Sequence, residues 1–138
     1  MRSDPFPFPS LTQYLLFSWE SISHCKGGFI RNWYYWERKT GGWKIRFEIG
    51  GNRYCLNKAR QHKSNHIYFI VDIKYSCFRQ YCHDDECKSF VSSAFPLPLQ
   101  ETEPIAEYFD AEKMLFTMDA CYHYLLTNKS ELHFFKHF

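Results

Sequence analysis

The sequence predicts a small α+β domain, in which a β-hairpin or small antiparallel sheet is flanked by short helices. Residues Trp43 to Ile49 alternate apolar with charged side chains, as a strand does when only one face is buried. Residues Ile67 to Ile73 are mostly β-branched or aromatic, which is the strongest strand signal in the chain. Apolar residues at helical spacing occur near both ends of the chain and predict the helices.

The N-terminal residues predict an extended lead-in followed by a short helix. Three prolines fall within Ser3 to Ser10, and proline favours extended or turn structure. Leu11 to Trp19 then carries apolar residues at helical spacing, and Ser10 stands where a cap would be. The glycine pair Gly27-Gly28 breaks the chain before the next element.

The middle of the chain predicts paired strands. An aromatic segment, Phe29 to Glu37, is joined to the first predicted strand by a turn at Lys39 to Gly42. Consecutive rings from Trp33 to Trp36 cannot all face one way on a strand. Some of them therefore belong to the core, and others are available to stack on bases. Cys77 to Tyr81 is the expected hairpin partner of the strand at 67–73.

The last third of the chain changes character. The block Phe95 to Gln100 has two prolines and should end the structured module. From Thr102 to Leu126 the chain is acidic and aromatic, and it predicts a helix. We therefore divide the chain into a lead-in with a short helix at 1–25, a central module at 26–100 and an acidic-aromatic, helical tail at 101–138.

Composition limits the class of protein. A chain of 138 residues suits one domain, or one domain with tails. Its 45% apolar and 20% aromatic residues exclude disorder throughout. No apolar run approaches the roughly 20 residues that span a bilayer, and the proline-rich start lacks a signal-peptide pattern. We expect no membrane segment and an intracellular, reducing compartment, where six cysteines indicate metal binding or plain thiols.

Charge is distributed unevenly. Residues 26–90 hold 13 Lys and Arg against 6 Asp and Glu, a net charge of +7, and residues 91–138 hold 3 against 7, a net charge of −4. A basic centre and an acidic end predict two different partners. The alternative is a solvated surface that happens to divide in this way.

Four Cys and His residues predict a metal site. Six residues separate Cys55 from His62, nineteen follow, and four separate Cys82 from Cys87. The predicted hairpin between the two pairs would return Cys82 towards Cys55. Zinc takes four such ligands in a tetrahedron, and three thiolates with one imidazole leave no position for water. We expect one structural zinc ion. The alternative is four unrelated residues among six Cys and seven His.

The remaining Cys and His residues are weaker candidates. His83 directly follows Cys82, and adjacent residues seldom bind one zinc ion together. Cys77 lies within a predicted strand, where a free Cys behaves as a small hydrophobe. Cys25 and Cys121 have no partner at metal-ligand spacing, so we interpret both as ordinary thiols.

This spacing and its surroundings resemble the zinc-binding C-terminal domain of the eukaryotic primase-polymerase (PrimPol) family. That domain is related to herpesvirus-type primases, within the archaeo-eukaryotic primase superfamily. The family pattern, C-x6-H and C-x4-C with nineteen residues between them, recurs at the four residues above. Similar flanking features are Arg60, the run His62 to Asn65, a strand ending in Val71-Asp72, and Cys82-His83-Asp84. The resemblance extends over roughly Pro5 to Pro98.

In such enzymes a catalytic core precedes this domain and supplies acids in a D-x-E arrangement and a nucleotide-binding S-x-H. Neither arrangement occurs here in a supporting context. We therefore assign no catalytic residue, and catalysis by this chain alone is not supported. The chain resembles a C-terminal module, a fragment or a truncated relative of a DNA-directed primase-polymerase, which is a nucleotidyltransferase.

The resemblance implies a module that holds DNA, single-stranded or template-primer, and the 5′-triphosphate of the initiating nucleotide. Cations on a metal-held segment suit phosphates, and hydroxyl and amide groups add hydrogen bonds to them. The residues expected to bind are Lys58, Arg60, Lys63, Ser64, Asn65, Lys74 and Arg79. Each cation is alternatively a solvated surface charge. The whole could instead be a zinc-stapled protein-interaction module without nucleic-acid binding.

The acidic tail has two interpretations. Tyr108, Phe109 and Asp110 lie in a segment that loosely resembles the acidic-aromatic motifs with which this family recruits replication protein A. Alternatively, the helix packs its apolar face on the central module. The resemblance also implies a role in DNA replication and translesion synthesis, in the nucleus, the mitochondrion or both.

Overall fold

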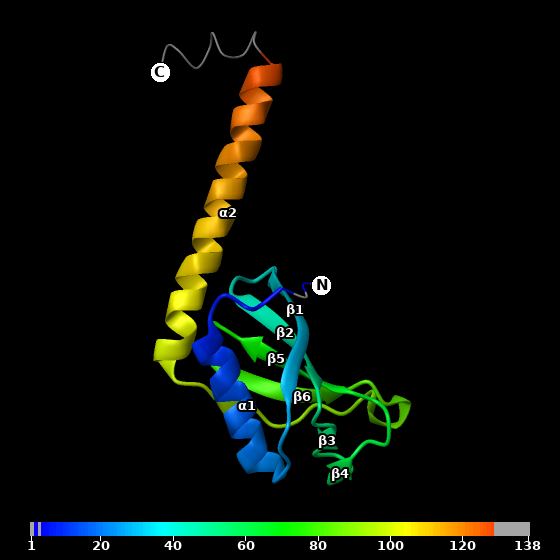
Figure 1. Cartoon of the computed structure of the whole chain (residues 1–138). Helices are drawn as coiled ribbons and strands as arrows, with labels where there is room; N and C mark the ends of the chain where they lie inside the picture. Colours follow the sequence, from blue (N-terminus) through cyan, green and yellow to red (C-terminus); the bar gives the residue numbers. More distant parts are fainter. Residues whose placement is uncertain (1, 3, 129–138) are drawn as a thin grey trace. The chain divides into compact units, whose positions relative to one another are not determined.

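The computed structural model describes residues 2 and 4–128, and it confirms the predicted α+β class (Figure 1). Five strands form one antiparallel sheet in the order β1-β2-β5-β6-β7, and β3 pairs with β4 separately. The chain divides into two compact units, Met1–Ala106 and Glu107–Phe138. The elements are α1 (Pro9–Ser23), β1 (Phe29–Glu37), β2 (Trp43–Gly50), β3 (Tyr54–Cys55), β4 (Arg60–Gln61), β5 (Ile67–Asp72), β6 (Cys77–Cys82), the 3-10 helix η1 (Asp85–Cys87), β7 (Phe95–Pro96) and α2 (Leu99–Thr127).

Helix α1 begins earlier than its sequence pattern predicts. Pro9 stands in the first turn, where its missing N–H is no loss and its fixed φ suits the helix. The N-cap position is Phe8, and no side chain caps the helix there. The predicted cap at Ser10 is therefore wrong. At the other end His24 adopts a left-handed conformation, and its N–H donates to the Glu20 carbonyl at 2.9 Å.

The sheet confirms the predicted strands and extends them. The aromatic segment forms β1 and pairs with β2, which pairs in turn with β5. The predicted hairpin is β5–β6, with Ile67 opposite Cys82 and Asp72 opposite Cys77. Phe95 and Pro96, which should end the module, instead pair with β6 as the edge strand β7. The pairing stays short because proline cannot donate to a ladder.

The hydrophobic core lies between α1 and one face of the sheet. Leu11, Leu15 and Trp19 share one side of α1 and are buried. The Trp19 ring packs 5.0 Å from the Phe69 ring of β5, in agreement with the position of α1 against the sheet in Figure 1. Because side chains alternate along a strand, this inner face is buried, and the opposite face, here called the outer face, is partly exposed.

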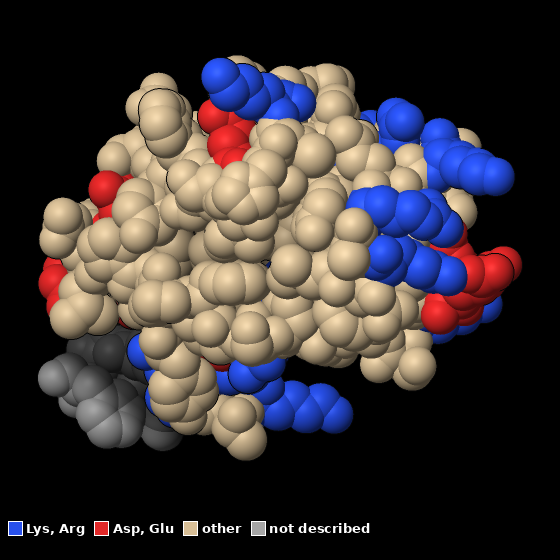
Figure 2. All heavy atoms as spheres, turned by 90° about the horizontal axis from the view of Figure 1, so that it is seen from below, with Lys and Arg blue, Asp and Glu red and all other residues tan. Residues whose placement is uncertain are grey.

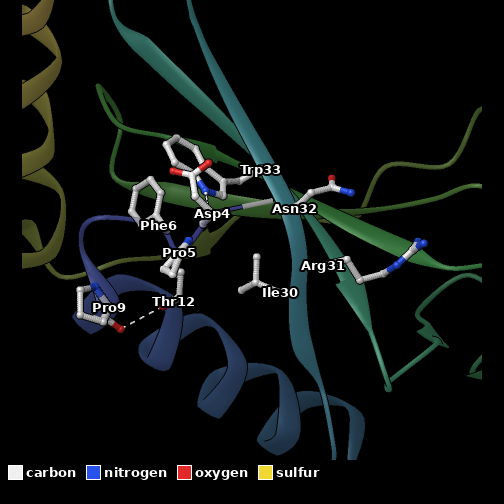
Figure 3. Close-up of a pocket in the computed structure, with 9 residues that line it drawn as sticks. All are labelled: Asp4, Pro5, Phe6, Pro9, Thr12, Ile30, Arg31, Asn32 and Trp33. Atoms are coloured by element: carbon white, nitrogen blue, oxygen red, sulfur yellow. Dashed lines mark hydrogen bonds between the residues drawn. The ribbon is translucent and has the colours of Figure 1, made fainter. Parts of the chain in front are cut away.

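The N-terminal lead-in is tied to the edge strand β1. Arg2 exchanges two backbone hydrogen bonds with Trp33, at 2.7 and 2.9 Å, and the Asp4 carbonyl accepts the Trp33 indole N–H at 2.8 Å. The Phe6 ring packs edge-on against the rings of Trp33 and Phe47. A pocket of about 330 Å³ lies between this segment, the start of α1 and β1 (Figure 3).

Helix α2 confirms the helix predicted for Thr102 to Leu126 and extends it slightly at both ends. It runs for 29 residues and begins ahead of the predicted helix. Thr102 and Ile105, in its first turns, are buried. Farther along, large apolar side chains are exposed: Met114, Leu115, Phe116, Met118, Tyr122, Tyr124 and Leu126. Among the described residues, no helix combines the length and apolar character needed to cross a bilayer.

Candidate metal centre

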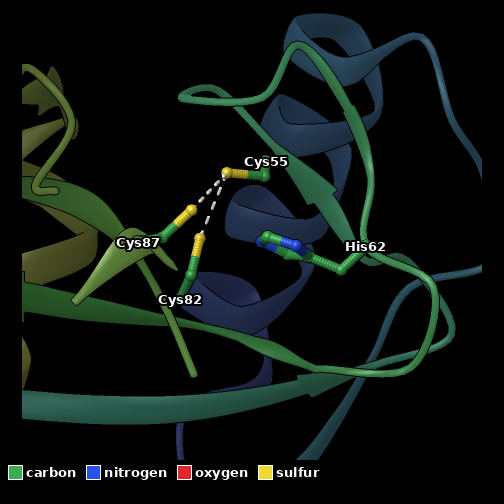
Figure 4. A group of neighbouring side chains, drawn as sticks. All are labelled: Cys55, His62, Cys82 and Cys87. Carbon is green, nitrogen blue, oxygen red and sulfur yellow. Dashed lines mark hydrogen bonds between the residues drawn. The ribbon is translucent and has the colours of Figure 1, made fainter. Parts of the chain in front are cut away.

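Cys55, His62, Cys82 and Cys87 form one buried cluster, in which the ligand atoms all lie within 4.8 Å of one another (Figure 4). The Cys55 sulfur lies 3.3 Å from the Cys82 sulfur and 3.8 Å from the Cys87 sulfur. Two thiolates bound tetrahedrally at about 2.3 Å from one zinc ion would lie roughly 3.8 Å apart. The four residues are therefore close enough to hold one metal ion together.

Four different elements position these ligands. Cys55 ends β3 and His62 directly follows β4, so the tight turn between two very short strands fixes the first pair. Cys82 ends β6 and Cys87 ends η1. The β5–β6 hairpin returns Cys82 to the first pair, as the spacing in the sequence predicted.

The imidazole of His62 supplies an independent test of whether a metal ion fits. His62 is buried, and its Nε2 has no hydrogen-bond partner in the described part of the chain. A buried polar nitrogen without a partner is costly. Its Nδ1 lies 3.2 Å from the Asp84 carboxylate, which would hold a proton on Nδ1 and leave the Nε2 lone pair for a cation. The donor set therefore fits a metal ion.

Three N–H groups are directed at the three sulfurs. The donors are the Gln80 amide to Cys82 at 2.8 Å, the Asn57 amide to Cys87 at 3.3 Å and the Lys58 backbone N–H to Cys55 at 3.4 Å. Such donors stabilise ligating thiolates and orient them. With no cation present, burial raises the pKa of the Cys82 thiol far above its usual value. A bound cation reverses that effect, because it favours the thiolate.

The four weaker candidates for metal ligands, His83, Cys77, Cys25 and Cys121, lie outside this cluster. His83 Nε2 lies 2.6 Å from the Glu48 carboxylate. Cys77 lies at the opposite end of β6 from the metal ligand of that strand, and burial raises the pKa of its thiol. Cys25 is half-buried and Cys121 is exposed. Within the described residues, none of these four joins a metal-binding group.

Four of the residues predicted to bind nucleic acid line one pocket next to the cluster. This His62 pocket has a volume of about 300 Å³ and is lined by Arg60, His62, Lys63, Ser64, Asn65, Asp84 and Glu86. Arg60, Lys63 and Ser64 are exposed. The structure therefore brings these cations together with hydroxyl and amide groups on the segment that contains His62 of the cluster.

The other three predicted residues are placed differently. Lys58 forms an ion pair with Glu86, and this hydrogen bond raises the pKa of Lys58. Lys74 lies in the β5–β6 turn, at the end of the hairpin away from the metal cluster. Arg79 lies on the outer face of β6 and donates to the Ser92 carbonyl at 2.9 Å. Lys74 and Arg79 do not line the His62 pocket.

Acidic residues share this surface, although none was among the residues predicted to bind. Asp84 accepts hydrogen bonds from the Asn65 amide at 3.3 Å and from the Glu86 backbone N–H at 2.8 Å, and the latter lowers the pKa of Asp84. Figure 2 shows Lys and Arg side chains at the top, the right and the bottom of the view, with Asp and Glu side chains among those on the right. The acidic run between Cys82 and Cys87 was the available signal, but spacing cannot tell which acid reaches His62.

The three tail residues predicted to bind a partner differ in exposure. Tyr108 is 39% exposed and Asp110 is exposed, whereas Phe109 is buried. Phe116, seven residues after Phe109, is 77% exposed. Among the described residues of the tail, the most exposed aromatic side chain is therefore in the middle of α2 rather than in the segment that the sequence indicated.

Known proteins match the part of the chain that holds the cluster. The model of the Herpesviridae UL52/UL70 DNA primase family matches residues 38–100. The DNA-directed primase/polymerase protein of Homo sapiens is 38% identical over 96 residues, which cover 68% of this chain and 16% of the human protein. That of Danio rerio is 40% identical over 97 residues, covering 67% of this chain and 17% of the relative. No solved structure matches the chain significantly.

The family match, the two relatives and the cluster agree with one another. All four cluster residues fall within the span of the primase family model. The chain spans only 16–17% of the length of these relatives, so the match concerns one domain of a much longer protein. The matched part of the chain is therefore a primase domain of the type found in PrimPol and in the UL52/UL70 family.

Proposed function

We propose that Cys55, His62, Cys82 and Cys87 bind one structural zinc ion. Three sulfurs and one imidazole nitrogen are a donor set that suits zinc. Four protein ligands leave no position for a water or a substrate, so zinc would supply a structural cross-link and not an activated water. The observation that carries the proposal is the buried Nε2 of His62, which faces the three thiols without a hydrogen-bond partner among the described residues.

The proposed role of this domain is to hold nucleic acid and the 5′-triphosphate of a nucleotide for a DNA primase-polymerase. The His62 pocket supports it, because Arg60 and Lys63 project from a segment whose position the metal would fix. Guanidinium and ammonium groups bind phosphate oxygens. Ser64 and Asn65 add groups that hydrogen-bond to phosphate or sugar.

Two acids border the same pocket, and their pairing decides its charge. Asp84 accepts hydrogen bonds from Asn65 and lies 3.2 Å from the His62 imidazole, and Glu86 pairs with Lys58. Neither Arg60 nor Lys63 pairs with a carboxylate in the part of the chain that the structure describes. The cations that remain for a phosphate are therefore Arg60 and Lys63.

The proposed function is tested with oligonucleotides of one sequence that carry either a 5′-triphosphate or a 5′-hydroxyl. The full chain should prefer the triphosphate, and Arg60→Ala with Lys63→Ala should remove that preference while retaining about one zinc per chain. Charge-assisted hydrogen bonds are worth roughly 1.5 to 3 kcal/mol each. Lys39→Ala, an exposed lysine in the β1–β2 turn, is the matched control. An unchanged preference in the double variant would reject the pocket as the phosphate site. Binding of neither oligonucleotide by the wild type would favour a zinc-stapled protein-interaction module.

A second proposed function is recruitment of a partner protein through α2. The observation that favours it is the row of exposed apolar side chains that includes Met114, Leu115 and Phe116. The basic single-strand-binding subunit of replication protein A is the partner that the family resemblance suggests. Phe116→Ala should weaken its binding to the full chain, and Phe17→Ala, which removes a ring that is 75% exposed on α1, should not. Equal binding by both variants would reject this role.

The activity of a whole primase-polymerase is a separate proposal. The relatives are named DNA-directed primase/polymerase, and this chain covers a small part of them. We propose that primer synthesis and translesion synthesis require the catalytic residues of a primase-polymerase core, none of which we assign to this chain. Nuclear or mitochondrial DNA replication is the proposed setting. Restored primer synthesis, when this domain replaces its counterpart in such a relative, would support the assignment.

A further inference from the structure

The outer face of the five-stranded sheet carries a row of aromatic side chains. Strand alternation sends Tyr34 and Trp36 of β1, Tyr68 of β5 and Tyr81 of β6 to this face. All four are only half-buried, whereas the rings of Phe47 and Phe69 on the inner face are fully buried. The row therefore lies outside the hydrophobic core.

These rings form two pairs that an arginine connects. Tyr68 and Tyr81 are opposite one another in the β5–β6 ladder, and their rings stack with centroids 5.1 Å apart and planes 9° apart. Tyr34 and Trp36 lie 5.4 Å apart on β1. The Arg46 guanidinium lies 3.6 Å from the Tyr68 ring centroid and 5.9 Å from that of Tyr34. Flat π-surfaces thus continue across β1, β2, β5 and β6.

The outer face is also hollowed beside Tyr81. A pocket of about 190 Å³ opens there, with Ile70 as an apolar part of its lining and Lys44 and Arg79 as its cations. Its remaining lining residues are Asp72, Tyr75, Cys77 and Tyr81. A concave site with rings, an aliphatic side chain and two cations suits a flat heterocycle that is linked to an anion.

The charges on this face leave an excess of cations. Glu48 is neutralised by Arg46 at 2.6 Å, and Asp72 by Arg38 at 2.8 Å, while His83 Nε2 lies 2.6 Å from the second Glu48 oxygen. Over the described chain, Lys44 and Arg79 have no carboxylate within ion-pair distance. Arg79 instead donates to the Ser92 carbonyl, a bond that leaves its charge uncompensated. The surface that results is aromatic and cationic, which is complementary to an unpaired polynucleotide.

We infer that the outer face binds single-stranded nucleic acid, with bases stacked on Tyr34 and Tyr81 and phosphates near Lys44 and Arg79. Tyr68 supports the Tyr81 ring, because Arg46 and Tyr81 already cover its two faces. This contact is separate from the His62 pocket and requires no 5′-triphosphate. The two surfaces approach one another at the end of β6, where Cys82 is a cluster residue and the neighbouring His83 ring lies 4.8 Å from that of Tyr68. A single-stranded oligonucleotide whose 5′ end lies in the His62 pocket can therefore continue onto the outer face.

The test measures binding of a 5′-hydroxyl oligothymidylate of about 15 nucleotides to the full chain by fluorescence anisotropy across a salt series. Tyr34→Ala and Tyr81→Ala should each weaken binding by roughly 5- to 150-fold, the effect of losing one base-aromatic stack. Tyr34→Phe and Tyr81→Phe should bind like the wild type, because each keeps the ring. Phe17→Ala, an exposed ring on α1, is the matched control and should have no effect.

Arg79→Gln is a second test, which remains informative if the tyrosine variants misfold. Arg79 is exposed, so its replacement should not disturb the fold. It should lower the slope of log affinity against log salt by about 0.7, the value for one lost phosphate contact on a single strand. The inference is overturned if tyrosine and Arg79 variants that retain metal and secondary structure bind as the wild type does. Equal affinity for duplex DNA would also overturn it, because paired bases cannot stack on rings.

The binding experiments distinguish the two proposed surfaces, because each surface predicts a different outcome. If the Arg60 and Lys63 variants lose only the preference for a 5′-triphosphate, while the tyrosine variants lose affinity for both oligonucleotides, both surfaces are supported. If the tyrosine variants are silent and the triphosphate preference persists in the wild type, only the outer face is rejected. If the wild type binds neither oligonucleotide, both are rejected, and the outer face belongs to a protein interface.

Discussion

The two ends of the first compact unit differ in the interactions available to stabilise them. Between α1 and the sheet, large rings such as Trp19, Phe47 and Phe69 are fully buried. The metal end, here residues 53–66 and 83–94, contains only two-residue strands and a three-residue 3-10 helix. Its buried residues are Cys55, His62, Cys87 and Ser92, so three of the four are proposed metal ligands. The core is stabilised by apolar burial, whereas the metal end has almost none, and we expect it to depend on the proposed metal ion.

Removal of the metal should give the largest effect and should separate the two ends. Structural zinc contributes on the order of 10 kcal/mol to the folding of small modules. Chelation, or Cys87→Ala, should abolish hydrogen-exchange protection at 53–66 and 83–94 while β1, β2 and β5 retain part of theirs. Cys121→Ala, which removes an exposed thiol, should keep about one metal per chain by native mass spectrometry. Complete unfolding on chelation would show that the core also depends on the metal.

Truncation of a core side chain should have the next largest effect, and it should destabilise the apolar core rather than the metal end. Phe69 is fully buried against Trp19, and Phe→Ala changes at such sites cost about 3 to 5 kcal/mol. Ile70→Ala, at the neighbouring half-buried position on the outer face, should cost on the order of 1 kcal/mol. Chemical denaturation with bound metal gives both values. Similar losses in the two variants would mean that the inner face is not the main source of stability.

The sequence predicted the core more completely than the metal end. Alternation of apolar and charged residues marks β2, and β-branched residues mark β5, because both patterns follow from burying one face of a strand. The spacing of four Cys and His residues predicted the cluster, because Cys and His can be recognised as candidate metal ligands from the sequence alone. The contact between His62 and Asp84 was not predictable, because it depends on how η1 packs beside β4.

Other differences arise from tertiary structure that outweighs local signals. The two prolines at Phe95–Gln100 predicted a break, but an edge strand needs few donors, and β7 forms there. Lys74 and Arg79 were grouped with Arg60 because all belong to the basic centre of the sequence. The β5–β6 hairpin, with six residues in each strand and roughly 3.3 Å per residue, places Lys74 far from the metal ligands.

The junction between the two ends should give an intermediate effect. Gly51 lies between β2 and β3 with a φ of 76°, and a Cβ there would collide with the Gly27 carbonyl oxygen. Gly51→Ala should cost more than the roughly 1 to 2 kcal/mol of left-handed strain alone, since the backbone must also move. Gly41→Ala, with a φ of 92° and no atom within 4 Å of the added Cβ, carries only the strain. Equal melting temperatures for the two variants would contradict the close approach.

The smallest expected effect concerns the acid that orients His62. Asp84 lies 3.2 Å from Nδ1 of His62, and loss of a carboxylate behind a metal-binding histidine typically weakens metal affinity 10- to 100-fold. Asp84→Asn keeps an oxygen that can accept from Nδ1–H but removes the charge, so the lower end of that range is expected. Competition with a chromophoric chelator measures the affinity. Asp85→Asn changes a neighbouring carboxylate that is 88% exposed and pairs with Lys88 at 3.2 Å, and it should leave metal affinity unchanged. If both variants weaken the metal equally, the general negative charge of the acidic run is responsible, and Asp84 has no special place behind His62. If only Asp84→Asn does so, the metal end owes its ligand geometry to a contact made within that end, independently of the apolar core.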